Sequence, residues 1–329
     1  MKILWLSEMG FFGQVPLDNP NLKSDVALIA CSGATHLPYN YPLKLEDYEQ
    51  FDFIMVNCTR KFFTEPNFIH YLPIIKKNFN IKVGFFQEGP IYDWQDWSQK
   101  EQSLWIKSMK LIDIYFCSNQ MDIPYYESYV KYNVPVKWLK SPIHLERIKS
   151  LIPSDIKKEG VVVGGTNCIW YNGQTSLKIA DILKEKIYIP RMGRMKEDEQ
   201  LYNNINIRSK VVTLPYLTFD EWLYNLNKCK FGVHMMAQVA AGSFHTNCAA
   251  LGIPCVGNAE IDPQRLLFPD LSIHLYRDIK KGRELLVKLH FEKSFYEEVV
   301  SKALNNVKAW DIQIVKKELL EMINEVISK

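Results

Sequence analysis

The sequence lacks the features of several protein classes. No apolar run approaches the ~20 residues that a membrane-spanning helix needs, and the opening MKILWLSEMG has no long apolar core of the kind found in secretory signals. The seven cysteines form no C-x-x-C pair, so the usual spacing of zinc ligands is missing. There is no internal repeat and no low-complexity segment. These absences predict a cytoplasmic protein with reduced cysteines and no requirement for a metal.

The sequence also lacks a large excess of either positive or negative charge. The formal net charge of the 329 residues is only +3, which by itself argues for neither nucleic acid nor an anionic membrane as partner. Hydrophobic residues make up 47% and charged residues 23%, the balance of an ordinary folded protein. The length is about twice that of a typical domain, so two domains are expected.

Continuous apolar runs alternate with amphipathic segments in the first half of the chain. Runs of this kind are typical of strands buried on both faces, and therefore of a parallel sheet with helical crossovers. The predicted strands are 2–7, 25–31, 52–58, 82–87, 114–119 and 136–140, and the predicted helices are 65–78, 96–111 and 121–131.

The alternation pauses at SPIHLERIKSLIPSDIKKEG and then restarts. We place the domain boundary in this segment and predict domains 1–148 and 149–329. In the second half the predicted strands are 160–165, 187–193, 210–215, 231–236 and 254–258, and the predicted helices are 175–186, 218–229 and most of 279–328. The fold class is α/β, with two Rossmann-like doubly wound domains in tandem and C-terminal helices.

The stretch AAGSFHTNCAALGIPCVGN, residues 240–258, places a glycine and polar residues where a helix should begin. The first backbone N–H groups of a helix are unpaired and carry a partial positive charge, so such a start binds anions well. The simpler interpretation is that Ser243 only caps the helix.

This stretch, with LPYLTFDEWLYNLNKCKFGVHMM before it, resembles the donor-binding segment of GT-B glycosyltransferases. The resemblance covers about 50 residues, and Ala250, Gly252, Pro254 and Val256 match the helix–turn–strand of that family. It implies a nucleotide sugar, such as a UDP-sugar, bound mainly by the C-terminal domain. It also implies that the final helix packs back on the first domain. The implied diphosphate-binding turn is formed by Ser243, Phe244, His245 and Thr246, mostly through backbone N–H groups.

The match is incomplete at two positions. Retaining members often carry two glutamates eight positions apart, and here these positions hold Val239 and Asn247. Asn247 is expected to hydrogen-bond a sugar hydroxyl. The departure leaves the stereochemistry and the sugar open.

Further donor-binding candidates follow other predicted strands of the second domain. Backbone at a glycine pair can approach phosphates, arginines can neutralise a diphosphate, and an aromatic ring can border a base. The alternatives are a tight turn, a solvated loop and a surface aromatic. The candidates are Gly164, Gly165, Thr166, Asn167, Arg191, Arg194 and Tyr216. His234 ends a predicted strand, where a histidine is more often structural than functional.

The acceptor is expected to bind to the first domain. A glycine-bearing loop carries Glu8, Gly10 and Gly13, and the run FFQEGPIYDWQDW combines carboxylates with aromatic rings. Rings stack on sugars or bases, and a carboxylate can accept a proton from a hydroxyl nucleophile. Glu88 is the first candidate for general base and Asp93 the second, unless Glu88 only fixes a turn. The remaining acceptor-binding candidates are Tyr92, Trp94 and Trp97.

The sequence therefore predicts a glycosyltransferase that moves a sugar from a nucleoside diphosphate sugar to a hydroxyl. The acceptor is a glycan or lipid-linked precursor, a protein, or DNA with hydroxymethylated bases, where a flipped base would need an aromatic cradle. Two alternatives stay open, a nucleotide-sugar 2-epimerase of the same architecture and a non-catalytic binding module. No cofactor beyond the nucleotide sugar is expected.

Overall fold

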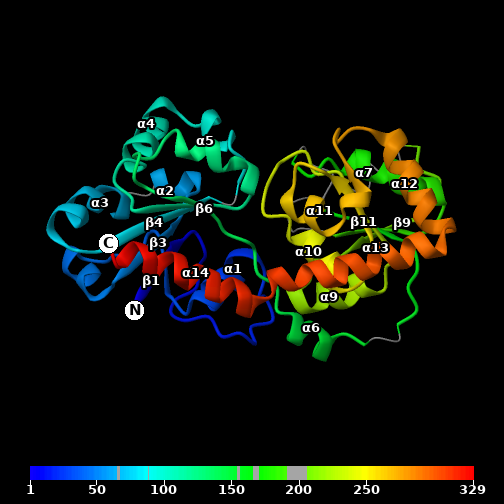
Figure 1. Ribbon diagram of the computed structural model, residues 1–329, viewed down its shortest axis with the longest axis horizontal. Helices are drawn as coiled ribbons and strands as arrows, with labels where there is room; N and C mark the ends of the chain where they lie inside the picture. Colours follow the sequence, from blue (N-terminus) through cyan, green and yellow to red (C-terminus); the bar gives the residue numbers. More distant parts are fainter. Residues whose placement is uncertain (65–66, 88, 154–155, 166–169, 191–205) are drawn as a thin grey trace. The chain divides into compact units, whose positions relative to one another are not determined.

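The computed structural model describes residues 1–64, 67–87, 89–153, 156–165, 170–190 and 206–329. The chain forms two compact units (Figure 1). The first contains Met1–Pro142 and Ile312–Lys329, and the second contains Ile143–Asp311. The chain thus leaves the first unit at Pro142 and returns to it at Ile312. The segment expected to be a linker holds helix α6 (Leu145–Leu151), which belongs to the second unit.

The first unit is built on a six-stranded sheet in the order β2-β1-β3-β4-β5-β6, with every pairing parallel. The strands are β1 (Ile3–Ser7), β2 (Thr35–Pro38), β3 (Phe53–Asn57), β4 (Lys82–Gln87), β5 (Ile114–Cys117) and β6 (Val136–Trp138). Alternate residues of each strand point to opposite faces. Trp5 and Phe53 lie in one apolar core, whereas Leu4 and Ile54 lie in the other.

Helices cover both faces of this sheet. The core containing Trp5 is closed by α1 (Ser24–Ser32) and α14 (Ile312–Ile327), which pack side by side (Figure 1). The other core is closed by α2 (Arg60–Thr64), α3 (Asn67–Asn78), α4 (Gln99–Ser108) and α5 (Ile123–Glu127). Burial on both faces explains why these strands have continuous apolar sequences.

The strand predicted at 25–31 is wrong, because this segment is helix α1. A short apolar run fits a buried strand or a buried helix equally well, and periodicity does not separate the two. Here Ala27, Leu28, Ile29, Ala30 and Cys31 are all buried between the sheet and α14. The strand next to β1 is instead β2, whose sequence THLP carries little apolar signal.

The second unit repeats the design with the order β12-β11-β10-β7-β8-β9, again with all pairings parallel. Its strands are β7 (Val161–Val163), β8 (Ile187–Pro190), β9 (Val211–Leu214), β10 (Phe231–His234), β11 (Cys255–Asn258) and β12 (Ser272–Ile273). Its described helices besides α6 are α7 (Gly173–Ala180), α9 (Phe219–Asn227), α10 (Ser243–Ala250), α11 (Asp262–Leu267), α12 (Ile279–Phe291) and α13 (Lys293–Asn306).

Short 3₁₀ helices complete the described structure. They are η1 (Leu45–Gln50), η2 (Asp93–Asp96), η3 (Gln120–Asp122), η4 (Asp181–Leu183), η5 (Pro269–Leu271) and η6 (Val307–Trp310). The tail predicted as helical over most of 279–328 forms α12, α13 and α14, with η6 between the last two.

Each sheet contains one point where the strand order reverses. In the first unit the chain moves from β1 to β2 on one side and to β3 on the other, so the reversal lies between β1 and β3. In the second unit it lies between β7 and β10. In doubly wound sheets, ligands bind beyond the carboxyl ends of the strands at such a point. A site is therefore expected among the residues after β7 and β10, and among those after β1 and β3.

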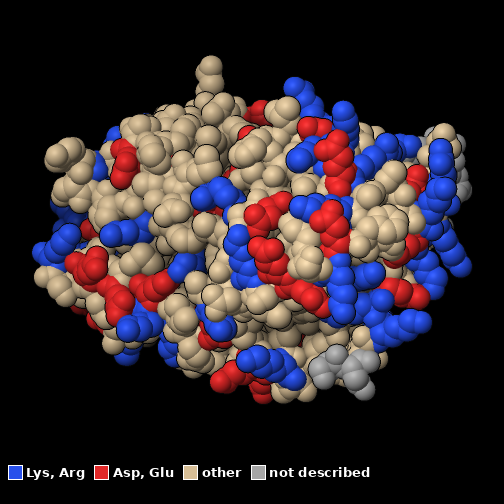
Figure 2. All heavy atoms as spheres, turned by 45° about the vertical axis from the view of Figure 1, so that its right-hand side comes forward, with Lys and Arg blue, Asp and Glu red and all other residues tan. Residues whose placement is uncertain are grey.

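On the face drawn in Figure 2, acidic and basic side chains are interspersed, so neither sign of charge dominates. Lys and Arg are denser along the right-hand edge. Among the described helices, none is both long and apolar enough to cross a bilayer.

Candidate functional site

The reversal point of the second unit brings the glycine pair and the start of α10 together around His234. A side chain at Gly164 would place its Cβ 2.5 Å from Cγ of His234, so the ring lies directly against the turn after β7. The same ring makes an edge contact with Phe244 at a centroid distance of 5.0 Å. The two predicted backbone turns are thus neighbours, although 79 residues separate Gly164 from Ser243 in the sequence.

Helix α10 begins after Gly242, whose φ of 66° is the left-handed conformation that glycine adopts at little cost. Among the described residues, none accepts a hydrogen bond from the N–H groups of Gly242, Ser243 or Phe244. These donors converge at the positive end of the helix dipole. The arrangement can bind an anion through the backbone alone.

The side chains of the first turn point inward rather than toward a ligand. Phe244, His245, Thr246 and Asn247 are buried, and only Ser243 is partly exposed. The Thr246 hydroxyl donates to the carbonyl of Ser243 at 2.8 Å. The predicted anion-binding role of this turn therefore belongs to its backbone N–H groups. The buried side chain of Asn247 is poorly placed to meet a sugar hydroxyl.

Two buried histidines lie beneath this helix start. His234, at the end of β10, and His245, in the first turn of α10, have ring centroids 5.0 Å apart and planes inclined by 26°. Burial lowers the pKa of His234 well below its usual range and that of His245 to about 4. Both rings are therefore neutral near pH 7.

The start of α7 also contributes to this region, through contacts with the residue that follows β10. It was not identified from the sequence. Asn172 adopts a left-handed conformation before α7 and donates through Nδ2 to the carbonyl of Met235 at 3.0 Å. The hydroxyl of Ser176 accepts from the N–H of Met235 at 2.9 Å. The loop after β10 is thus fixed to the loop after β7. The Asn172–Gly173 dipeptide is a turn signal that could have identified this position.

The other predicted donor residues are only partly described. Thr166, Asn167, Arg191 and Arg194 lie outside the described residues. Gly165 has φ of 74°, and a Cβ there would lie 2.3 Å from Cγ of Tyr171, so glycine is required at this turn. Tyr216 follows β9 at the same edge of the sheet and is exposed, but β9 is two strands away from β7.

The first unit also has a buried polar pair at its reversal point, and the sequence did not indicate it. The hydroxyl of Ser7 donates to Nε2 of His36 at 2.7 Å, while Nδ1 of His36 donates to the carbonyl of Phe11 at 2.8 Å. Gly13 and His36 exchange two backbone hydrogen bonds. These contacts hold the predicted loop after β1 closely against β2.

Of the two glycines predicted in this loop, only one adopts a backbone conformation that favours glycine. Gly13 has φ of 85°, which favours glycine, whereas a Cβ at Gly10 would meet open space. Glu8 is about half exposed and lies 3.7 Å from Nζ of Lys61, which follows β3. Carboxylate and ammonium groups therefore meet at this reversal point.

Asp93 is the predicted base that the structure describes, whereas Glu88 lies outside the described residues. Asp93 is partly buried beside Gly89, with Oδ2 3.7 Å from the position of a Cβ there. Burial and repulsion from Asp96 raise its pKa, against a smaller opposing effect of Arg60. The guanidinium of Arg60 is itself paired with Glu101, at 3.1 Å.

The aromatic residues predicted to contact the acceptor divide into two groups. Trp94 and Trp97 are buried in the apolar core, where Trp94 stacks on Trp105 at 4.6 Å and Trp97 packs on Phe63 at 5.2 Å. The structure therefore assigns both rings to the core, because core residues cover the faces an acceptor would need. Tyr92 is 44% exposed and is the ring of this group that solvent reaches.

The structure offers no metal site among its described residues, and a further hollow lies away from the reversal point of the second unit. Within the described ranges, no group of three or more His, Cys, Asp or Glu side chains is arranged to hold a metal ion.

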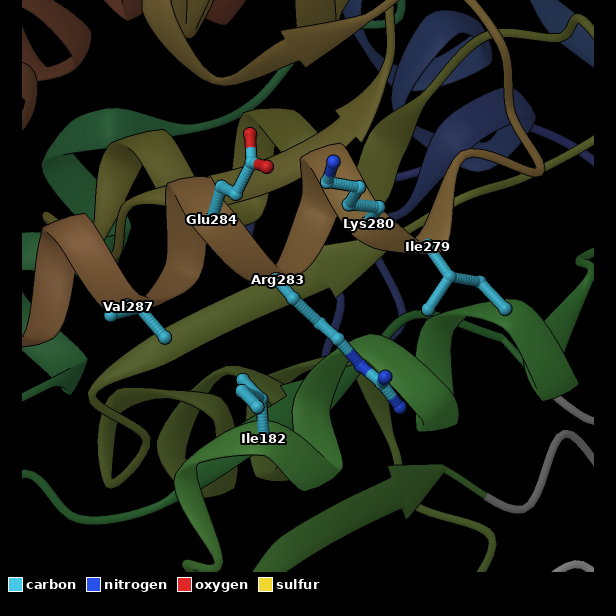
Figure 3. A pocket seen from close by; sticks show the side chains of 6 residues that line it. All are labelled: Ile182, Ile279, Lys280, Arg283, Glu284 and Val287. Atoms are coloured by element: carbon cyan, nitrogen blue, oxygen red, sulfur yellow. The ribbon is translucent and has the colours of Figure 1, made fainter.

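A hollow on the second unit lies between α12 and η4, with Arg283 directed from α12 across it (Figure 3). Nε of Arg283 donates to the carbonyl of Lys178 at 2.9 Å. None of its lining residues belongs to the reversal point.

Comparison of the sequence with protein-family models and with curated proteins finds no match. Comparison of the fold with solved structures finds similarity over nearly the whole chain. Sucrose-phosphate synthase from Thermosynechococcus elongatus is 10% identical, with 99% of each chain covered and a TM-score of 0.71.

The HepE protein of Anabaena, solved in complex with UDP-glucose, is 12% identical, with a TM-score of 0.73 over 99% of this chain and 100% of that chain. Trehalose-6-phosphate synthase OtsA is 9% identical, with a TM-score of 0.71 over 98% of this chain and 99% of that chain. At such identities the likeness concerns the fold. Two parallel doubly wound units, their shared topology and these neighbours show that the chain has the GT-B fold of glycosyltransferases.

Proposed function

We propose that this protein is a glycosyltransferase that uses a UDP-sugar as donor. One observation carries the proposal, namely the unpaired backbone N–H groups at the start of α10 beside the Gly164 turn, at the reversal point of the second unit. The uridine nucleotide is inferred from the structural neighbours, of which HepE was solved with UDP and with UDP-glucose.

The chemistry proposed for this site is electrostatic. Negative charge grows on the diphosphate as the bond to the sugar breaks, and backbone N–H groups fixed before the reaction stabilise it without reorganisation. Glycosyl transfer of this kind needs no metal, and we propose none. The acceptor hydroxyl is bound by the first unit, where Asp93 accepts its proton if configuration is inverted.

The acceptor proposed is a neutral hydroxyl of a glycan. Beside the carboxylate of Asp93, the exposed ring of Tyr92 offers a stacking surface. Carboxylates accept hydrogen bonds from hydroxyls, whereas they repel phosphates. No comparison supports hydroxymethylated DNA as acceptor, and none favours the 2-epimerase or a non-catalytic module.

The test is binding followed by turnover. Calorimetric titration with UDP, GDP and dTDP should give saturable binding with UDP favoured. A panel of UDP-sugars should then release UDP only when a glycan acceptor is present. Isomerisation of the sugar without acceptor would indicate the epimerase instead. Absence of binding by every nucleoside diphosphate would reject the proposal.

A further inference from the structure

The buried histidines beneath the helix start, His234 and His245, form what we call the histidine pair. Their exposed fractions are 3% and 0%. Within the described part of the chain, neither ring nitrogen of His234 has a hydrogen-bond partner, and neither does Nε2 of His245. Nδ1 of His245 lies 3.3 Å from the carbonyl of Gly242, the residue that precedes α10.

Leaving these groups unpaired has an energetic cost. A buried polar atom without a partner loses its hydration and gains nothing in return. Two apolar side chains in place of the pair would avoid this cost. The unmet hydrogen-bonding capacity lies between the turn at Gly164 and the helix start at Ser243, which is where the proposed function requires an anion.

Among the residues that the structure describes, no carboxylate contributes to the pKa shifts of the histidine pair. His234 is surrounded by Tyr171, Phe244, Gly164 and its partner ring. Next to Gly242, helix α11 begins with Asp262, whose carboxylate is engaged by Arg265 at 2.5 Å. A ligand would therefore bring the strongest negative charge to this place.

Building on the proposed donor site, we propose that the histidine pair takes up one proton from solvent when a diphosphate binds at the start of α10, and returns it when the diphosphate leaves. Without a ligand, burial keeps both rings neutral. A negative charge about 5 Å away in a medium of effective dielectric constant ~20 favours the protonated ring on the order of a hundredfold. Two such charges suffice to bring His245 from a pKa of about 4 to near neutrality.

The coupling gives nucleotide affinity a defined pH dependence. The complex binds more protons than the free protein, so affinity must rise as pH falls from alkaline values toward neutrality. Between the pKa of the free pair and the higher pKa of the liganded pair, the dissociation constant should increase by up to about tenfold per pH unit. Above the liganded pKa it should level off, because no proton is then taken up on binding. This behaviour is opposite to that of a site that loses affinity only because the UDP phosphate itself becomes protonated at low pH.

The experiment is calorimetric titration of the full chain with UDP at pH 7, in two buffers of different ionisation enthalpy. The wild type should take up about half to one proton more than the variant His245→Gln or the double variant His234→Gln/His245→Gln. Subtracting the variants removes the contribution of UDP itself. The matched control is His290→Gln on α12, which alters a partly buried histidine paired with Glu185 at 3.4 Å and should retain the wild-type uptake.

UDP binding with equal proton uptake in the wild type and both variants would overturn the proposal and leave the proposed function intact. If the variants fail to fold, histidine ring signals of the wild type are followed by NMR during UDP titration, and two rings that stay neutral overturn it equally. Failure of UDP to bind to the wild type would reject the proposed function, and this proposal with it.

Discussion

At the scale of single residues, Asp93 is the strongest described candidate for a catalytic base. It is partly buried in η2 after β4, and its exposed neighbour Asp96 lies in the same 3₁₀ helix. Asp93→Asn keeps the shape of the side chain but removes its basicity, so kcat should fall by about 10²–10⁴-fold. Asp96→Asn is the matched control and should stay within a few-fold of wild type in an assay of UDP release. Near-normal turnover of Asp93→Asn would remove Asp93 from the mechanism.

The environment of Asp93 also predicts a pH profile. Burial and the charge of Asp96 raise its pKa. A base must be ionised to act, so kcat should fall as pH drops through this raised pKa. Asp96→Asn removes the repulsion, lowers the pKa of Asp93 and should move the acid limb of the kcat profile to lower pH. An acid limb at the same pH in both proteins would contradict this assignment.

At this scale the sequence located the two backbone turns on which the proposed site depends. The turn at Gly164 and the start of α10 were visible as glycines followed by polar residues. The contact between Ser7 and His36 was not visible, because only the parallel pairing of β1 with β2 joins residues 29 positions apart. Trp94 and Trp97 were misjudged because a tryptophan beside carboxylates has the same local sequence whether its ring faces solvent or the core.

At the scale of elements, the start of α10 depends on one glycine. Gly242 has φ of 66°, and a Cβ there would lie 2.8 Å from Cγ2 of Ile261 and 2.9 Å from Cγ of Pro263. Gly242→Ala should therefore lower the free energy of unfolding by about 2–4 kcal/mol, through backbone strain and overpacking together. It should also weaken UDP binding at least about tenfold, because the N–H groups of the first turn shift.

The matched control is Gly252→Ala, just beyond the other end of the same helix. Gly252 has a similar φ of 62°, but its nearest neighbour, Cγ1 of Val300, is 3.3 Å from the added Cβ. This variant should lose only about 1–2 kcal/mol of stability and keep its UDP affinity, measured by denaturant unfolding and calorimetry. Equal losses of affinity in both variants would show that the position of Gly242 in the site is irrelevant.

The strands that are buried on both faces could be predicted from the sequence. Strands such as β3 and β4 are apolar on both faces, so their continuous runs identify them. Helix α1 has the same kind of run because it is enclosed between the sheet and α14, and only its neighbours in space decide its conformation. Strand β2 escaped notice because His36 is buried by a specific pairing with Ser7 rather than by apolar character.

At the scale of the whole molecule, the first unit is made of two separate segments of the sequence. Helix α14 ends the sequence but belongs to the first unit, to which it contributes Val315, Leu319 and Ile323. Sequence analysis expected the last helix to pack on the first domain from the family resemblance. Apolar periodicity alone predicts a buried face for such a helix but not the unit that receives it.

Because α14 packs in the first unit, a substitution that destabilises α14 should lower the stability of the first unit alone. Leu319 is fully buried, so Leu319→Ala should lower the stability of that unit by about 2–5 kcal/mol. Ile314, on the same helix, is 42% exposed, and Ile314→Ala should change stability by less than about 0.5 kcal/mol. In scanning calorimetry Leu319→Ala should shift one transition downward.

UDP should act on the other transition. A ligand present at 100 times its dissociation constant stabilises the unit that binds it by about 2.7 kcal/mol. We therefore expect UDP to raise the transition of the second unit in the wild type and in Leu319→Ala alike, while the transition lowered by the substitution stays unresponsive. A single transition that responds to both changes would mean that the two units unfold together. UDP stabilisation of the transition that Leu319→Ala lowers would place the nucleotide in the first unit, against the site at α10.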